Sequence, residues 1–157
     1  MLKYYNYDIV FREIPNHVTL AINITNCPNH CVGCHSSHLQ QDVGEVLDEN
    51  LLDSLLDRYA TSITYFCFMG GDQDPLRVAQ LAKYVQRCWP DIKTAWYSGC
   101  DKLPAGFDLQ AFQYIKLGRY DERFGSLDSP LSNQHLFKIG SDGNMEDMTY
   151  LFWRCGL

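Results

Sequence analysis

The sequence predicts an α/β fold in which parallel strands alternate with helices. Short segments with the composition of strands alternate with segments whose apolar residues recur at helical spacing. Most of the predicted strands are also followed at once by glycine, serine or cysteine, as expected where parallel strands present their carboxyl ends to a ligand. The chain has 157 residues, of which 46% are hydrophobic and 20% charged, so we expect one compact domain over residues 1–157.

The first predicted unit is a strand at residues 18–25 followed by a helix. The even-numbered residues of this strand are apolar, and the odd-numbered ones are small or polar. One face can therefore pack in the core, while the other suits a sheet that curves around a ligand; an ordinary half-exposed strand explains the alternation equally well. The helix is predicted from Asp48, a residue type that caps helices, and from an apolar stripe between Leu51 and Tyr59.

The second unit is a buried strand at residues 63–69, which is apolar on both faces and rich in β-branched and aromatic residues. Asp74 followed by Pro75 predicts the start of a helix, and Pro90 predicts its end. Further strands are predicted at residues 92–97, 114–117 and 135–139.

The rest of the C-terminal half is expected to be less regular. A short irregular or helical piece is predicted around 104–108, and a loop at 121–134. The strand at 135–139 is expected to pair with part of 148–153 across a turn at Asp142 and Gly143.

The composition excludes several classes of function. The formal net charge is −6, from 13 Lys and Arg against 19 Asp and Glu, and no basic cluster occurs, so no nucleic-acid partner is expected. No apolar run approaches the length of a membrane span, and the first residues lack a signal sequence, so no membrane association is expected. Seven cysteines without an export signal predict a reducing, cytoplasmic location.

Residues 27–35, with the sequence CPNHCVGCH, form the most informative motif. Cys27, Cys31 and Cys34 can converge on one centre when a loop wraps around it, and iron–sulfur clusters and zinc both select such thiolates. Three ligands are one fewer than a closed structural site needs, so one coordination position stays open. The main alternative is a zinc site closed by His35 or His38. Clustered core cysteines are disfavoured by the Pro, Asn and Gly residues around them.

The segment Gly70-Gly71-Asp72 follows the second predicted strand. Paired glycines let the backbone approach a ligand closely. Asp72 and the carbonyl groups of Gly70 and Gly71 could accept hydrogen bonds from the amino group of an amino acid that chelates the open iron. A tight turn is the alternative. Because the carboxyl ends of parallel strands meet at one edge, we expect residues 97–99 and 118–119 to lie beside this segment and the cysteine motif.

With these motifs, the chain resembles the activating proteins of anaerobic ribonucleotide reductase, which are small radical S-adenosylmethionine enzymes. The matching segments are residues 8–10, 27–35, 70–72, 97–99, 118–120 and 132–134, in the family's order over nearly the whole length. The spacing Cys-x3-Cys-x2-Cys is typical of the superfamily. Gly33, where many superfamily members carry an aromatic residue, points to this branch.

The resemblance implies an α/β fold of a particular kind, an incomplete parallel (β/α) barrel of the radical S-adenosylmethionine type, and two cofactors. Cys27, Cys31 and Cys34 would ligate a 4Fe-4S cluster. The residues expected to contact S-adenosyl-L-methionine are Gly33, Cys34, His35, Gly70, Gly71, Asp72, Ser98 and Asn133. No side chain is assigned as a general acid or base.

The activity implied by the resemblance is activation of a glycyl-radical enzyme. The cluster would reduce S-adenosylmethionine, and the resulting 5′-deoxyadenosyl radical would remove hydrogen from a glycine of the large subunit of anaerobic ribonucleotide reductase. The implied partners are that subunit and a one-electron donor such as flavodoxin or ferredoxin. Activation of another glycyl-radical enzyme, such as pyruvate formate-lyase, is one alternative, and a non-catalytic zinc-binding interaction module is another.

The sequence departs from the family's pattern at four places. Residues 13–17 replace a segment that often carries glycine and arginine, and Leu117 stands where an acidic residue is common. Gln73 and Asp74 are extra residues before Pro75, and Cys100 occupies a position that is usually aromatic. These departures concern contacts with the substrate and partner rather than the cluster.

Overall fold

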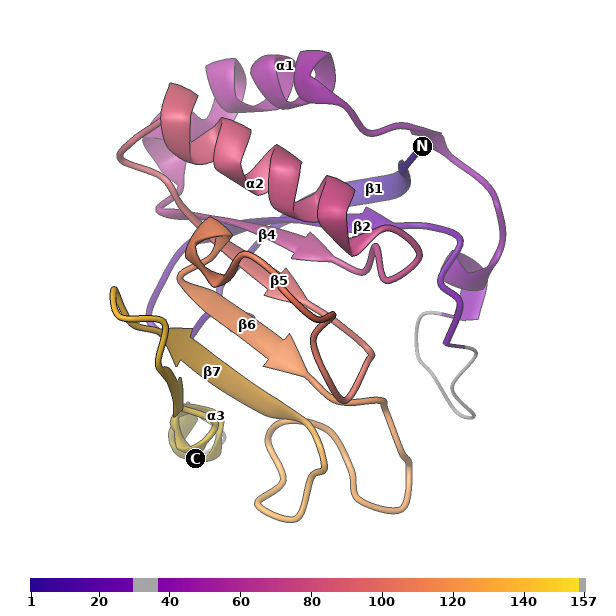
Figure 1. The fold of residues 1–157 in the computed structure, drawn as a ribbon, viewed down its shortest axis with the longest axis vertical. Helices are drawn as coiled ribbons and strands as arrows, with labels where there is room; N and C mark the ends of the chain where they lie inside the picture. The colour runs from indigo at the N-terminus through magenta and orange to yellow at the C-terminus, as the bar shows by residue number, and fades with distance from the viewer. Residues whose placement is uncertain (30–36, 156–157) are drawn as a thin grey trace.

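The computed structural model describes residues 1–29 and 37–155 of the chain. Figure 1 shows helices α1 and α2 together over one face of a sheet, with α3 beside β7. In chain order the elements are β1 (Lys3–Val10), β2 (Thr19–Ile24), η1 (Ser37–Gln40), β3 (Glu45–Val46), α1 (Glu49–Tyr59), η2 (Ala60–Ser62), β4 (Tyr65–Met69), α2 (Pro75–Cys88), β5 (Lys93–Tyr97), η3 (Leu109–Ala111), β6 (Tyr114–Leu117), β7 (His135–Ile139), β8 (Met145–Asp147) and α3 (Tyr150–Cys155).

The strands form one open, mixed sheet in the order β3-β1-β2-β4-β5-β6-β7-β8. The central strands β2, β4, β5 and β6 run parallel to one another, which confirms the parallel arrangement predicted for this part of the chain. The pairs that flank this centre on both sides are antiparallel. An open sheet of this kind does not by itself identify a barrel of the radical S-adenosylmethionine type, which stays a prediction.

Two parts of the sheet differ from the prediction. Strand β1 is not predicted from the sequence, because none of its side chains is fully buried and its alternation is weak. The hairpin across Asp142 and Gly143 is confirmed, but the predicted strand within 148–153 is wrong. Strand β8 ends at Asp147, whose carboxylate accepts a hydrogen bond from the Thr149 backbone N–H (2.9 Å), and this turn leads into α3.

The two faces of the parallel strands belong to two separate hydrophobic clusters. Leu20, Phe66 and Trp96 point into the larger core, which α1 and α2 cover. Ala21, Cys67 and Ala95 alternate with them and face the other side, where Ile14 and Phe152 pack. The expected face of small residues is therefore confirmed for the first strand, whereas its parallel neighbours also place Tyr65, Met69 and Tyr97 on that side.

The two long helices begin where the sequence predicts. The Asp48 carboxylate accepts a hydrogen bond from the Leu51 backbone N–H, and the Asp74 carboxylate accepts one from the Arg77 backbone N–H, so both residues cap their helices. Among residues 1–29 and 37–155, no helix has the length and apolar character that a membrane crossing requires.

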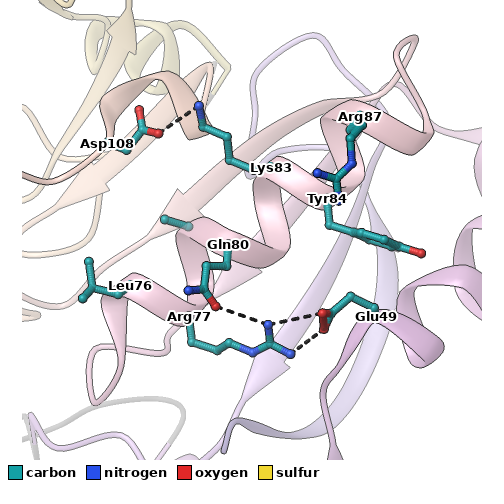
Figure 2. A pocket seen from close by; sticks show the side chains of 9 residues that line it. Glu49, Leu76, Arg77, Gln80, Lys83, Tyr84, Arg87 and Asp108 are labelled. Atoms are coloured by element: carbon teal, nitrogen blue, oxygen red, sulfur yellow. Dashed lines mark hydrogen bonds and ion pairs between the residues drawn. The ribbon is translucent and has the colours of Figure 1, made fainter.

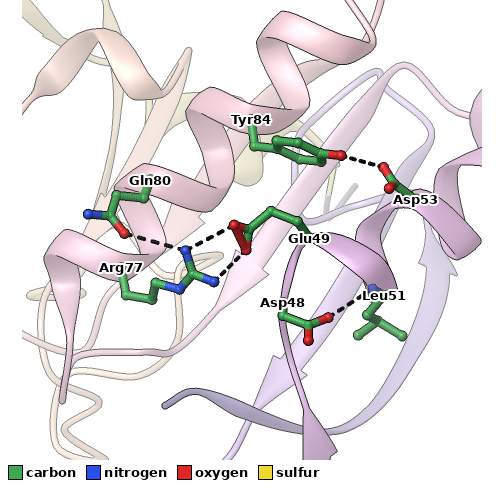
Figure 3. A network of polar contacts seen from close by, with 7 residues as sticks. All are labelled: Asp48, Glu49, Leu51, Asp53, Arg77, Gln80 and Tyr84. Atoms are coloured by element: carbon green, nitrogen blue, oxygen red, sulfur yellow. Dashed lines mark hydrogen bonds and ion pairs between the residues drawn. The ribbon is translucent and has the colours of Figure 1, made fainter.

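Polar contacts join α1 to α2 on the outer surface. The Arg77 guanidinium forms an ion pair with Glu49, and the Tyr84 hydroxyl donates to Asp53 (2.7 Å; Figure 3). Glu49, Arg77 and Tyr84 line a pocket of about 540 Å³ (Figure 2). In the same pocket Lys83 pairs with Asp108 (2.8 Å). Because these charged groups already have protein partners, we interpret the pocket as part of the helix packing rather than as a ligand site.

The ion pair predicts how stability changes with pH. The hydrogen bond from Arg77 lowers the pKa of the Glu49 carboxyl, so the pair stabilises the fold above the ordinary pKa of glutamate and this contribution is lost as the pH falls through the lowered value. Both side chains are partly exposed, so Arg77→Gln should cost no more than about 1 kcal/mol at pH 7.

Urea unfolding at pH 7 and pH 3 measures this effect, with Lys102→Gln as a control on an exposed basic residue. The difference between Arg77→Gln and the wild type should shrink towards zero at pH 3. A difference of the same size at both pH values would contradict the ion-pair explanation.

Candidate cofactor site

The loops that follow β2, β4 and β5 meet at one edge of the sheet, because these strands are parallel neighbours. We call this region the carboxyl edge and define it as residues 25–29, 70–73 and 98–101. It contains Cys27 of the cysteine motif together with the predicted cofactor residues Gly70, Gly71, Asp72 and Ser98. The expectation that these segments lie together is confirmed for the described residues.

The Asp72 carboxylate connects the three loops of the carboxyl edge. Its Oδ1 accepts a hydrogen bond from the Ser98 hydroxyl (2.5 Å). Its Oδ2 accepts two more, from the Gly99 backbone N–H (2.8 Å) and from the Asn29 side-chain amide (2.7 Å). A carboxylate has about four lone-pair sites, so three are used by the protein and about one is left for a ligand.

The glycine pair after β4 has a clear conformational reason. Gly70 and Gly71 have φ angles of +107° and +92°, which side chains rarely tolerate. Their carbonyl groups, which the sequence predicts as acceptors for a ligand, each already accept one hydrogen bond from the protein. The Gly70 oxygen accepts from the Trp96 indole N–H (2.7 Å), and the Gly71 oxygen accepts from the Asp74 backbone N–H (3.0 Å). Each carbonyl keeps one lone pair for a further donor.

Backbone and side-chain hydrogen bonds hold the segment that carries Cys27. The Cys27 N–H donates to the Leu39 carbonyl (2.9 Å), and the Gln73 side-chain amide donates to the Thr25 carbonyl (2.8 Å). Gln73 is one of the residues that the sequence adds before Pro75, and this contact gives it a role in fixing the loop. The half-buried Cys27 thiol thus has a defined place at the carboxyl edge.

The other described cysteines differ in their surroundings. The Cys100 thiol lies at the carboxyl edge, where it donates to the Asn29 side-chain oxygen (3.8 Å). Burial, followed by the nearby Asp72 charge, raises the pKa of Cys100. Cys67 is fully buried, and burial raises its pKa well above the ordinary value, as expected for an inert core thiol. Cys88 is exposed at the end of α2.

Asn133 lies one strand further along the sheet, beside the end of β6. Its amide donates to the Arg119 carbonyl (2.8 Å), and its backbone carbonyl lies against Gly118. Its side-chain oxygen is buried without a hydrogen-bond partner in the described part of the chain, so an acceptor remains for a ligand. In the described part of the chain the hydrogen-bond partners of Asp72 are Asn29, Ser98 and Gly99, so Asn133 lies at the end of the next strand rather than in the Asp72 network.

The remaining predicted site residues, Cys31, Gly33, Cys34 and His35, lie outside the described residues. Within residues 1–29 and 37–155, no group of three His, Cys, Asp or Glu side chains is arranged to hold a metal ion. Ligation of a cluster by the three cysteines therefore stays a prediction.

A pocket of about 480 Å³ opens beside the carboxyl edge on the face of the sheet opposite α1 and α2. Met69 and Tyr97, the last residues of β4 and β5, line it together with Glu13 and Gln134. The buried Lys116 contacts two of these lining residues. Its ammonium donates to the Gln134 side chain (3.2 Å) and lies 5.5 Å from the centre of the Tyr97 ring. The sequence alone does not predict a buried cation at this place. The pocket thus reaches the last residues of β4 and β5, which precede Gly70 and Ser98 in the chain.

Asn29 is the residue at the carboxyl edge that sequence reasoning overlooks. Its amide contacts Asp72, Cys27 and Cys100, which come from three different loops. Asparagine between two cysteines of a motif indicates only a turn, so no local signal could have identified these contacts.

The described residues supply one of the three cysteines that the motif implies as ligands, together with several hydrogen-bond acceptors. Cys27 supplies a soft ligand, and Asp72, Gly70, Gly71 and Asn133 each retain acceptor capacity near it or on the neighbouring strand. Such a set can bind a ligand that carries an amino group beside a metal centre.

No family model, no curated protein and no solved structure matches the chain. The motifs of the sequence and the geometry of the carboxyl edge are therefore the features that indicate a function.

The hydrogen bonds of Asp72 predict a large effect of Asp72→Asn on stability. The substitution removes the negative charge and turns one of the two positions into a donor, which faces either the Ser98 hydroxyl, which must then turn to accept, or the N–H groups of Asn29 and Gly99. We expect unfolding to become easier by about 1–3 kcal/mol. Urea unfolding measures this cost, and Asp91→Asn, at an exposed aspartate, is the control. Equal stabilities of the two variants would show that the network does not hold the loops together.

Proposed function

We propose that this chain is a radical S-adenosylmethionine activating enzyme that installs a glycyl radical on anaerobic ribonucleotide reductase. The observation that carries the proposal is the junction of Cys27, Asp72 and Ser98 at one edge of four parallel strands, through hydrogen bonds of Asn29 and Asp72. This is the edge at which ligands of parallel α/β sheets bind. A metal-binding motif and an acceptor set for an amino acid would thus share one site.

The described residues suggest how the site would hold its cofactors. Cys27 would ligate a 4Fe-4S cluster together with Cys31 and Cys34. S-adenosylmethionine would lie against Gly70, Gly71, Asp72 and Ser98, with Asn133 on the neighbouring strand, and Gly33 and His35 are further contacts proposed from the motif. The chemistry that these cofactors would supply when bound is a 5′-deoxyadenosyl radical, which would take a hydrogen atom from a glycine of the reductase.

The chain's own residues would bind and orient rather than transfer protons. The remaining lone pairs of Asp72 and of the Gly70 and Gly71 carbonyls would accept the amino group of the ligand. Buried Trp96 and Ser98 fix these acceptors through hydrogen bonds, so their positions cost little reorganisation on binding.

The large subunit of anaerobic ribonucleotide reductase is the proposed substrate. The pocket at Met69 and Tyr97 opens to the surface beside the proposed cofactor site, which supports a macromolecule completing its wall. The electron would come from a donor such as flavodoxin or ferredoxin, and we propose that the chain acts in the cytoplasm.

The cluster is tested by anaerobic reconstitution and metal analysis. The wild type should be brown and hold about four irons per chain, because three cysteines and an open iron are the ligand set of the proposed 4Fe-4S site. Cys27→Ala should lose most of this iron, whereas Cys88→Ala, at an exposed helix end, should retain it. A colourless wild type that binds one zinc per chain would favour a zinc-binding interaction module and contradict the proposal.

The activity is tested by mixing the reconstituted protein with the reductase, S-adenosylmethionine and a strong reductant under anaerobic conditions. A glycyl-radical doublet in the EPR spectrum of the reductase is the expected result. If the doublet forms on pyruvate formate-lyase but not on the reductase, the chain is an activating enzyme for another glycyl-radical partner. Absence of the doublet with a fully loaded cluster would refute the assignment.

A further inference from the structure

The Asn29 side chain occupies the centre of the carboxyl edge. Its amide nitrogen donates one hydrogen bond to Asp72 (2.7 Å) and one to the Cys27 sulfur (3.7 Å). Because a primary amide has two N–H groups, both are used. The Asp72 carboxylate also fixes the orientation of the amide, since the reversed orientation would place the Asn29 oxygen against a negative charge.

The structure leaves space for this amide at Gly99. A Cβ atom on residue 99 would lie 2.6 Å from the Asn29 amide nitrogen and 3.4 Å from an Asp72 oxygen. Contacts below 3.0 Å require a neighbour to move, so a side chain at this position would displace Asn29. The position of the Asn29 amide therefore requires a glycine at residue 99.

A hydrogen bond to a ligating sulfur affects the electronic properties of an iron–sulfur centre. It draws electron density from the sulfur and stabilises the more negatively charged, reduced state, which raises the reduction potential. Asn29 also stands between Cys27 and the Asp72 carboxylate, whose negative charge would have the opposite effect. Removing Asn29 would delete the hydrogen bond to the sulfur and would also expose the sulfur to the Asp72 charge. Both changes lower the reduction potential.

We propose that Asn29 is a positioning residue that holds Cys27 against the Asp72 loop and, through its N–H group on the Cys27 sulfur, raises the reduction potential of the bound cluster. This inference rests on the proposed function, because it requires a cluster at Cys27. Beyond that function, it assigns to Asn29 an influence on how readily the cluster accepts an electron.

EPR-monitored redox titration of the reconstituted full-length protein, without S-adenosylmethionine, tests the inference. The variants are Asn29→Ala, Asn29→Asp and Gly99→Ala, and Cys88→Ala is the matched control. The midpoint potential should be lower in Asn29→Ala than in the wild type, and lower still in Asn29→Asp, which replaces the donor by a negative charge. Gly99→Ala should shift the midpoint in the same direction, because it displaces the amide while leaving residue 29 unchanged. Cys88→Ala should have the wild-type midpoint.

The outcomes separate this inference from the proposed function. Iron-loaded Asn29→Ala and Gly99→Ala proteins with the wild-type midpoint would overturn the role of Asn29 and leave the cluster assignment intact. A wild-type protein that binds no iron would overturn both. The potential is a suitable readout, because a residue that only anchors the loop would alter iron content or stability without moving the midpoint.

Discussion

The hydrogen bonding of one carboxylate determines the geometry of the carboxyl edge. Asp72 accepts from Asn29, Ser98 and Gly99, and thereby joins the loops after three parallel strands. Bonds from neutral donors to an ionised acceptor are stronger than those between neutral groups, and burial of Ser98 protects one of them from competition by water. The glycines at 70, 71 and 99 make this packing possible, because a side chain at any of them would crowd a neighbouring residue.

Much of the fold could be predicted because the sequence pattern of each strand and helix agrees with the parallel arrangement that they form. The composition of β4 and β5, the capping aspartates of α1 and α2 and the residues that follow each strand all indicate parallel units. The proximity of Gly70-Gly71-Asp72 to Ser98 and Cys27 then follows from topology alone, because parallel neighbours end at the same edge.

The parts that could not be predicted depend on contacts between distant segments. Strand β1 exists because it pairs with β2, although its own pattern of burial is weak. The strand predicted within 148–153 is wrong because a polar turn at Asp147 ends β8, and the apolar segment that follows forms α3 instead. Asn29 acts through residues that lie 43 and 71 positions away, and no periodicity in the sequence records such contacts.

The structural and the proposed ligand-binding roles of Asp72 are compatible rather than alternatives. Three protein donors leave the carboxylate about one lone-pair site, so a bound amino group would have to share its hydrogen bonds with other acceptors. The Gly70 and Gly71 carbonyls each have one lone pair left for this purpose, and the Trp96 indole and the Asp74 backbone N–H already fix their directions. Recognition by three partly used, rigid acceptors is more selective than recognition by one free carboxylate, because a ligand must satisfy all three positions at once. The same bonds that hold the loops together would thus define the shape of the group that the site accepts.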